Sequence, residues 1–276
     1  MKKKELFACI GALMLSFTSC VKDESVCIAT NVESKETMDR AEVQNLIQQA
    51  RYGDADAYKT LAYCYRDGQG VKKSAMNALF MYSLYCNKTG KKDKDIVELF
   101  EEGSPYRLLF EILDAPDLNQ ETEMKIEQFR QISPADAKII KPIRDFLVIK
   151  KNNNVLETLK EAEAEGSELA SLLQVLYHEE KRDTAMYRQC LLRMADKHPM
   201  LNAKIAQLYE TRYATDDDFP YVLKAMEYYY KVDSFGMLTP RQANHLWSIY
   251  DYFGQKGLLE YDKIEVERLK IIMKNH

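Results

Sequence analysis

From residue 37 onward, apolar residues recur every three or four positions, which is the spacing of one face of an α-helix. The first such face consists of Val43, Leu46, Ile47 and Ala50. The next consists of Ala57, Tyr58, Leu61 and Tyr65. Because this helical period returns along the body of the chain, the pattern predicts an all-α protein.

Two of these helical segments are separated by Asp67-Gly68-Gln69-Gly70-Val71. Gly68 and Gly70 can adopt positive φ without steric cost, so they predict the end of one helix and a tight turn. Ser74 is placed to cap the following helix, and Val71 is predicted to fill the apolar seam of the hairpin. The segment therefore predicts two antiparallel helices joined by a short turn.

Residues 50–86 resemble a Sel-one-like repeat, a tetratricopeptide-related unit of two antiparallel helices. The positions that match its pattern are Gly53, Asp54, Ala57, Leu61, Ala62, Tyr65, Gly68, Gly70, Val71, Lys73, Ala78 and Leu79. Several fixed offsets are matched at once, which makes the resemblance specific. It implies an α-α superhelix (solenoid) of antiparallel helical hairpins.

The remaining sequence carries weaker copies of this unit. We expect one helical-repeat domain over residues 37–276, with its clearest repeat at 50–86, an irregular middle at 91–152 and degenerate repeats at 153–276. Apolar positions that echo the first unit are Leu173, Tyr177, Leu223, Ala225, Met226 and Tyr229. One hairpin cannot bury both of its faces and usually needs about three neighbours, so extension of the array is expected.

Local signals mark individual helices. Ser133-Pro134 predicts the N-cap and first residue of a helix that runs to about Lys151. Pro142 lies inside this segment and lacks a backbone donor, so it predicts a kink or break there. A last helix is expected from Tyr261 to Lys274, where it would close the stack.

The first nineteen residues predict a secretory signal peptide. Positive Lys2 to Lys4 precede the apolar run Leu6 to Phe17, and small Thr18 and Ser19 precede Cys20, which is the order of such leaders. The 12 residues of this run span about 18 Å as a helix, which is too short for a hydrocarbon core of roughly 30 Å. We therefore expect residues 1–19 to be removed.

The tetrad Phe17-Thr18-Ser19-Cys20 resembles the lipobox of bacterial lipoproteins, with Phe at the position where Leu is more usual. The resemblance implies cleavage before Cys20 and acylation of this residue, for which palmitate is a suitable label. Two or three acyl chains make a stable membrane anchor. Residues 20–36 are then the lipidated cysteine and a flexible tether.

The charged residues that follow, Lys22-Asp23-Glu24, resemble the surface-export signal of lipoproteins in some Gram-negative groups; a solvated linker is the alternative. We expect the protein in the cell envelope, at the outer membrane, on either its periplasmic or its cell-surface face. The net charge of −4 includes +2 from the leader, which leaves −6. Such an acidic chain without a basic stripe argues against nucleic acid as a partner.

No motif in the sequence predicts catalysis, a metal or a cofactor other than the covalent lipid on Cys20. The histidines are His178, His198, His245 and His276. They form no zinc motif, and no phosphate-binding loop or nucleophile elbow is present. Asp216-Asp217-Asp218 lacks the spacing of an EF-hand loop and is interpreted as an acidic loop between helices.

Cys27, Cys64, Cys86 and Cys190 would remain in an oxidising compartment, where disulfides form. Cys64 and Cys86 both lie late in their helices of the predicted hairpin. Antiparallel helices place two such positions at opposite ends, beyond the limit of about 7 Å between Cα atoms. We predict that these two residues are not joined and interpret the cysteines as buried thiols.

Eighteen tyrosines are interpreted mainly as core residues between hairpins, with a carbohydrate or peptide platform as the alternative. By analogy with related repeats, the first helix of each hairpin lines a concave face. In the clearest repeat, the positions off the core face are Asp56, Lys59, Tyr63 and Arg66. Because Tyr and Arg are favoured interface anchors, these residues are the candidate partner-binding face.

The leading hypothesis is a lipid-anchored, non-catalytic scaffold that binds another envelope protein or a peptide. The sequence leaves the partner and the oligomeric state open. A receptor for a small ligand or cell-wall fragment is the second hypothesis, and it requires a deep pocket. A hydrolase is the third, and it requires two carboxylates about 5 to 9.5 Å apart in a cleft.

Overall fold

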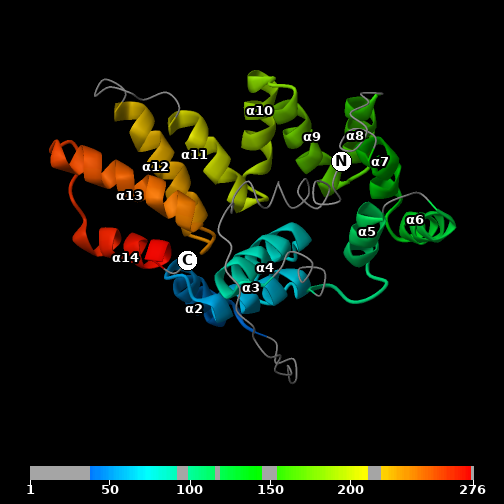
Figure 1. Cartoon of the computed structure of the whole chain (residues 1–276), viewed down its shortest axis with the longest axis horizontal. Coiled ribbons are helices and arrows are strands. Elements are labelled where there is room, and N and C mark those ends of the chain that lie inside the picture. Colours follow the sequence, from blue (N-terminus) through cyan, green and yellow to red (C-terminus); the bar gives the residue numbers. More distant parts are fainter. Residues whose placement is uncertain (1–37, 92–98, 116–118, 145–153, 211–218, 275–276) are drawn as a thin grey trace. The chain divides into compact units, whose positions relative to one another are not determined.

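The computed structural model describes residues 38–91, 99–115, 119–144, 154–210 and 219–274 (Figure 1). In this part of the chain every regular element is a helix, and no strand is present. The predicted all-α architecture of antiparallel helical hairpins is confirmed. Residues 1–37, which include the predicted leader, Cys20 and Cys27, lie outside the described residues, as do Asp216, Asp217 and Asp218.

The chain forms two compact units. Unit 1 comprises the described residues from 100 to 196, and unit 2 comprises those from 38 to 99 and from 197 to 274. Unit 2 is therefore built from two separate stretches of sequence.

Unit 1 is a run of consecutive helices. They are α5 (Pro105–Asp114), α6 (Gln120–Ile132), α7 (Pro134–Arg144), α8 (Val155–Ala164), α9 (Glu168–Glu180) and α10 (Thr184–Met194). Each packs against the next in the sequence, and α7 also contacts α9. Packing between sequence neighbours is the pattern of a helical repeat array.

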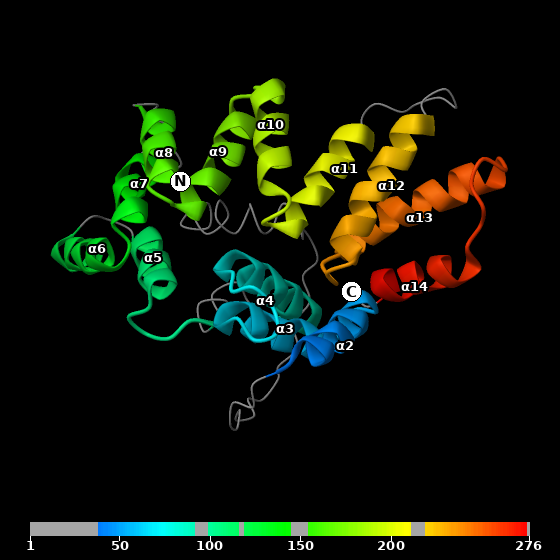
Figure 2. The ribbon, with the colours of Figure 1, turned by 180° about the vertical axis from the view of Figure 1, so that it is seen from behind.

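Unit 2 combines an N-terminal and a C-terminal group of helices. The N-terminal helices are α2 (Arg40–Arg51), α3 (Ala55–Asp67) and α4 (Ala75–Thr89). The C-terminal elements are the short 3-10 helix η3 (Pro199–Leu201), α11 (Asn202–Glu210), α12 (Phe219–Asp233), α13 (Pro240–Gln255) and α14 (Lys263–Lys274). Helix α3 packs along α4, α11 along α12, and α13 along α14. Within this unit α4 also contacts η3, and α2 lies beside α14 (Figure 2).

The α3–α4 hairpin forms at the predicted residues. Gly68 ends α3 with a φ of 78°, and Gly70 has a φ of 63°, as their position between two helices predicts. The Ser74 side chain accepts a hydrogen bond from the backbone N–H of Asn77 and caps α4. Val71 is only half-buried, so it fills the seam of the hairpin only in part.

Helix α4 is buried on every side from Met76 to Cys86, including its polar residues Asn77 and Ser83. A helix that is apolar around its whole circumference belongs inside a protein rather than at its surface. Helix α3 is amphipathic by contrast, and its predicted apolar face is buried. The difference explains why α3, and not α4, presents a polar side.

Within the middle segment 91–152, the described residues form α5, α6 and α7. Helix α7 starts at Pro134, as predicted, and continues through Pro142 to Arg144. The predicted break therefore does not occur at Pro142 itself. The rest of the predicted helix, up to Lys151, lies outside the described residues.

One predicted core position is wrong. In α12, Ala225, Met226 and Tyr229 are buried as expected, but Leu223 is 45% exposed. The buried face includes Val222 instead, and the next residue along a helix points about 100° away. Two adjacent apolar residues left the choice of face ambiguous in the sequence.

Candidate interaction surface

The four residues of the candidate partner-binding face lie on one side of α3. Asp56, Lys59, Tyr63 and Arg66 follow at intervals of three or four residues, which brings them to one helix face. Asp56 is exposed, and the other three are half-buried. We call this set the α3 strip.

The side chain of Arg66 is fixed by contacts within unit 2. Its Nε and Nη2 donate to the two carboxylate oxygens of Asp67 at 2.8 and 2.7 Å, and its Nη1 donates to the carbonyl of Leu99 at 3.0 Å. The guanidinium carbon lies 4.7 Å from the ring centroid of Tyr63. Because two planar contacts fix this side chain, Arg66 organises one end of the strip.

Aromatic rings of α4 support the other end. The ring centroids of Tyr82 and Tyr85 lie 5.4 Å apart, and Tyr63 meets Tyr82 edge-on at 6.4 Å. The Lys59 Nζ lies 5.6 Å from the centroid of Tyr85, and the Lys91 Nζ lies 5.5 Å from the same ring. Each such cation–aromatic contact contributes about 0.5–1 kcal/mol. Tyr82 and Tyr85 are themselves buried, which fits the interpretation of tyrosines as packing residues.

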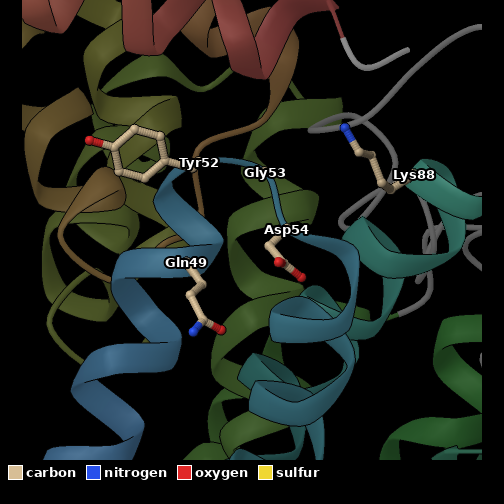
Figure 3. A pocket seen from close by; sticks show the side chains of 5 residues that line it. All are labelled: Gln49, Tyr52, Gly53, Asp54 and Lys88. Atoms are coloured by element: carbon tan, nitrogen blue, oxygen red, sulfur yellow. The ribbon is translucent and has the colours of Figure 1, made fainter.

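An open hollow of about 480 Å³ lies at the turn between α2 and α3 (Figure 3). It is lined by Gln49, Tyr52, Gly53, Asp54 and Lys88. Tyr52 and Lys88 lie on opposite sides of the turn, and Gln49 and Asp54 point in a common direction (Figure 3). Partial burial lowers the pKa of Lys88, although the carboxylate of Asp54 opposes this shift.

A second hollow of about 340 Å³ lies between α6 and α7 in unit 1. Its lining residues are Glu123, Ile126, Arg130, Pro134, Ala137, Lys138, Ile140 and Lys141. Ile126, Ala137 and Ile140 form a buried apolar floor. Each of the two hollows is lined by a single carboxylate, whereas glycoside hydrolysis uses two. Neither hollow supports the hydrolase hypothesis.

Two further features bear on chemistry and location. The described residues contain no group of three or more His, Cys, Asp or Glu side chains that could hold a metal ion. In the same part of the chain, no helix has the length and apolar character needed to cross a membrane.

The cysteines of the described helices are buried. Cys64 and Cys86 are not bonded to each other, as the antiparallel hairpin predicts. Cys64 and Cys190 are thiols whose pKa is raised, mainly by burial. A raised pKa reduces the thiolate fraction and hence reactivity, so these residues act as packing groups.

A charge network in unit 2 was not predicted from the sequence. Asp233 of α12, which is 1% exposed, accepts hydrogen bonds from Arg51 of α2 and from Arg268 of α14 at 3.0 Å each. Arg268 also donates to the backbone carbonyl of Arg51 at 2.8 Å. These residues join helices far apart in the sequence, and no local pattern identifies such partners.

Comparison with solved structures gives a likeness of low sequence identity. The structure is similar to the crystal structure of a Sel1 repeat protein from Oxalobacter formigenes, with a TM-score of 0.43 and 17% sequence identity over 86% of this chain and 99% of the other. No family model matches the sequence, and no curated protein matches it.

Proposed function

We propose that this protein is a lipid-anchored, non-catalytic scaffold of the bacterial outer membrane that binds another envelope protein or a peptide through the α3 strip. The observation that carries the proposal is the ordered state of the strip. Arg66 is fixed by Asp67 and Leu99, and Lys59 lies over a ring of α4. Side chains that are ordered before binding lose less entropy on binding.

The anchor part of the proposal is supported by the sequence around Cys20. Residues 21–37 separate this cysteine from the first described residue. If extended, this stretch reaches roughly 60 Å. A tether of this reach would let the α3 strip meet partners at some distance from the membrane surface.

Metabolic labelling tests the anchor. We expect labelled palmitate on the wild-type protein and on a Cys27→Ser variant, and loss of the label from Cys20→Ser, because only Cys20 is the cysteine of the lipobox-like tetrad. Gel fluorography of the purified protein measures the label. Label retained by Cys20→Ser, or absent from the wild type, would contradict acylation at this residue.

A charge exchange tests the α3 strip. Exchanging Asp56→Lys together with Lys59→Asp keeps the net charge and leaves the contacts of Arg66 in place. We expect the yield of partner adduct, after crosslinking in intact envelopes and mass spectrometry, to fall at least tenfold. The free energy of unfolding should fall by no more than about 1–2 kcal/mol, because Asp56 is exposed and the contact between half-buried Lys59 and the ring of Tyr85 contributes about 0.5–1 kcal/mol.

A matched control exists on α12. Lys224 and Glu227 are an exposed pair at the same spacing, so Lys224→Glu with Glu227→Lys should leave the adduct yield unchanged. An equal loss from both exchanges would mean that partner binding depends on general surface charge and not on the α3 strip. Replacement of Tyr63 and Arg66 by alanine is a poorer test, because it also removes the contacts to Asp67 and Leu99.

The hollow at the α2–α3 turn supports the second hypothesis, a receptor for a small ligand or cell-wall fragment. The hollow is open rather than deep, so the support comes from Tyr52, whose aromatic ring at its edge is 49% exposed and could stack on a sugar or peptide group. Binding of cell-wall fragments that is lost in Tyr52→Ala but retained in the Asp56 and Lys59 exchange would favour the receptor over the scaffold.

A further inference from the structure

Three lysines gather where the end of α4 lies beside the start of α3. The Nζ atoms of Lys59 and Lys91 lie 5.6 and 5.5 Å from the ring centroid of Tyr85. Lys88 follows Tyr85 by three residues, which places it on the same side of α4. All three lysines are half-buried. We call Lys59, Lys88 and Lys91 the lysine cluster.

The charge of the lysine cluster is not neutralised within the described residues. None of its ammonium groups forms an ion pair there, whereas Lys125, which is also half-buried, pairs with Glu111 and Glu121 at 3.1 Å each. The dipole of α4 places only about half a negative charge at this end of the helix. Partial burial lowers the pKa of Lys88, as expected for a cation that loses water without gaining an ion-pair partner.

The carboxylates at the start of α3 do not supply the missing partner. Asp54 and Asp56 are exposed, and one carboxylate oxygen of Asp54 accepts a hydrogen bond from the backbone N–H of Ala57 at 3.0 Å and so caps the helix. The side chains of Lys88 and Asp54 point in different directions (Figure 3). This end of the hairpin therefore presents neighbouring cations and anions rather than one uniform charge.

We propose that the lysine cluster binds an acidic segment of the protein partner, in which two or more Asp or Glu side chains face the three ammonium groups. The inference rests on the proposed function, because Lys59 belongs to both the lysine cluster and the α3 strip. Carboxylate oxygens form strong charge-assisted hydrogen bonds with ammonium groups. Each half-buried lysine would thereby gain the opposite charge that its surroundings do not provide.

The mixed charges select a protein segment over an anionic membrane surface. A uniformly anionic surface would approach Asp54 and Asp56 together with the lysines, and both carboxylates would repel it. A polypeptide can place acidic residues beside the lysines and a neutral or basic residue beside Asp56, because its side chains change from one position to the next. Tyr63, four residues after Lys59 on the same face of α3, offers such a segment an aromatic contact.

Carbodiimide coupling in intact envelopes tests this chemistry, because the reagent forms an amide between a carboxylate and a lysine amine that touch each other. Mass spectrometry of the purified full chain should find the lysine cluster joined to Asp or Glu of another protein. The control is Lys160 of α8, which is exposed and should couple at least fivefold less. Equal coupling at Lys160, no coupling, or coupling of the lysine cluster only to carboxylates of this chain would overturn the proposal.

Charge reversal separates this inference from the proposed function. The partner adduct is formed through a photocrosslinking residue in place of Tyr63, so lysine chemistry plays no part. Lys88→Glu with Lys91→Glu should lower the adduct yield at least fivefold, whereas Lys88→Arg with Lys91→Arg keeps the charge and should retain it. Circular dichroism of both variants checks that the helices are intact.

Each other pattern of adduct yields has a definite meaning. An equal loss from the arginine variant would show that charge is not the cause and would overturn the acidic segment. Loss in the Asp56 and Lys59 exchange, without loss in the reversal of Lys88 and Lys91, would also overturn the acidic segment but leave the scaffold in place. No loss in either would overturn both.

Discussion

The two glycines of the α3–α4 turn, Gly68 and Gly70, have a backbone conformation that was predicted from the sequence and a packing environment that was not. The positions of Gly68 and Gly70 between two helical segments predicted positive φ, which the structure has. The structure adds a close approach at Gly70, where a Cβ would lie 2.6 Å from Val43 Cγ2 and 2.7 Å from the carbonyl oxygen of Asp39. The turn of the α3–α4 hairpin therefore also packs closely against the start of α2.

This close approach predicts unequal costs for two alanine substitutions. Gly70→Ala should destabilise unit 2 by about 3 kcal/mol or more, since it adds a clash with backbone atoms to the cost of positive φ. Gly257 has a φ of 70° with no atom within 4 Å of a built Cβ, so Gly257→Ala should cost only about 1–2 kcal/mol. Urea denaturation measures the free energy of unfolding of both variants. Equal losses of stability would contradict the close packing of Gly70 against α2.

The contacts of the α3 strip were likewise only partly predictable from the sequence. Helical spacing placed Asp56, Lys59, Tyr63 and Arg66 on one face, because a helix repeats every 3.6 residues. It could not show that Arg66 is bound to Asp67 and Leu99, since Leu99 lies beyond the next helix. Which residues of the strip remain open to a partner was therefore a question for the structure.

Three successive helices of unit 1 converge on one carboxylate. Glu163 of α8 accepts hydrogen bonds from Ser171 and Gln174 of α9 at 2.8 and 2.7 Å, and Arg193 of α10 lies 3.0 Å away. Burial alone would raise the pKa of Glu163, but these hydrogen bonds and the positive charge of Arg193 outweigh it and lower the pKa below its usual value. The ionised carboxylate therefore stabilises the packing of α8, α9 and α10.

The lowered pKa of Glu163 gives the stability of unit 1 a pH dependence. A carboxyl group with a lower pKa in the folded state stabilises the fold above its unfolded pKa of about 4.3, and this contribution is lost as the pH falls through the folded value. We expect Glu163→Gln to lower the free energy of unfolding by about 1–3 kcal/mol at pH 7. The difference from wild type should shrink below about pH 4 in urea titrations at several pH values. A pH-independent difference would contradict this account.

At the scale of the whole molecule, unit 2 departs from a linear array. Asp233 bonds to Arg51, which is 182 residues away, and to Arg268, so the first and last described helices stabilise each other. The buried Tyr58 of α3 has its pKa raised by burial and, to a smaller extent, by this carboxylate. In a linear array each repeat contacts only its neighbours; here early and late helices share one core.

Neutralising Asp233 should therefore destabilise α2 and α14 together. We expect Asp233→Asn to cost about 3–5 kcal/mol, because it leaves the charge of buried Arg268 only partly compensated. Hydrogen exchange should speed up in α2 as well as in α12 and α14. Glu227→Gln, on the exposed side of α12, is the control and should change little. Faster exchange in α14 without any change in α2 would contradict the coupling.

Much of the fold could be read from local pattern. The helices of the 50–86 repeat, the N-cap at Ser74 and the start of α7 at Pro134 follow from residues a few positions apart. The face of α12 was misjudged at Leu223, because adjacent apolar residues satisfy two alternative faces. The fully buried state of α4 depends on neighbours that a helical period does not specify.

By itself, the sequence determined the helical hairpins and their turns, because φ preferences, caps and apolar period act over a few residues. The tertiary structure decided which surfaces of these helices remain open. Among the described residues, it bound Arg66 to the carbonyl of Leu99, gathered Arg51, Asp233 and Arg268 into one network and left Ile264 of α14 81% exposed. Those outcomes depend on contacts between residues distant in the sequence, whose partners no local pattern encodes.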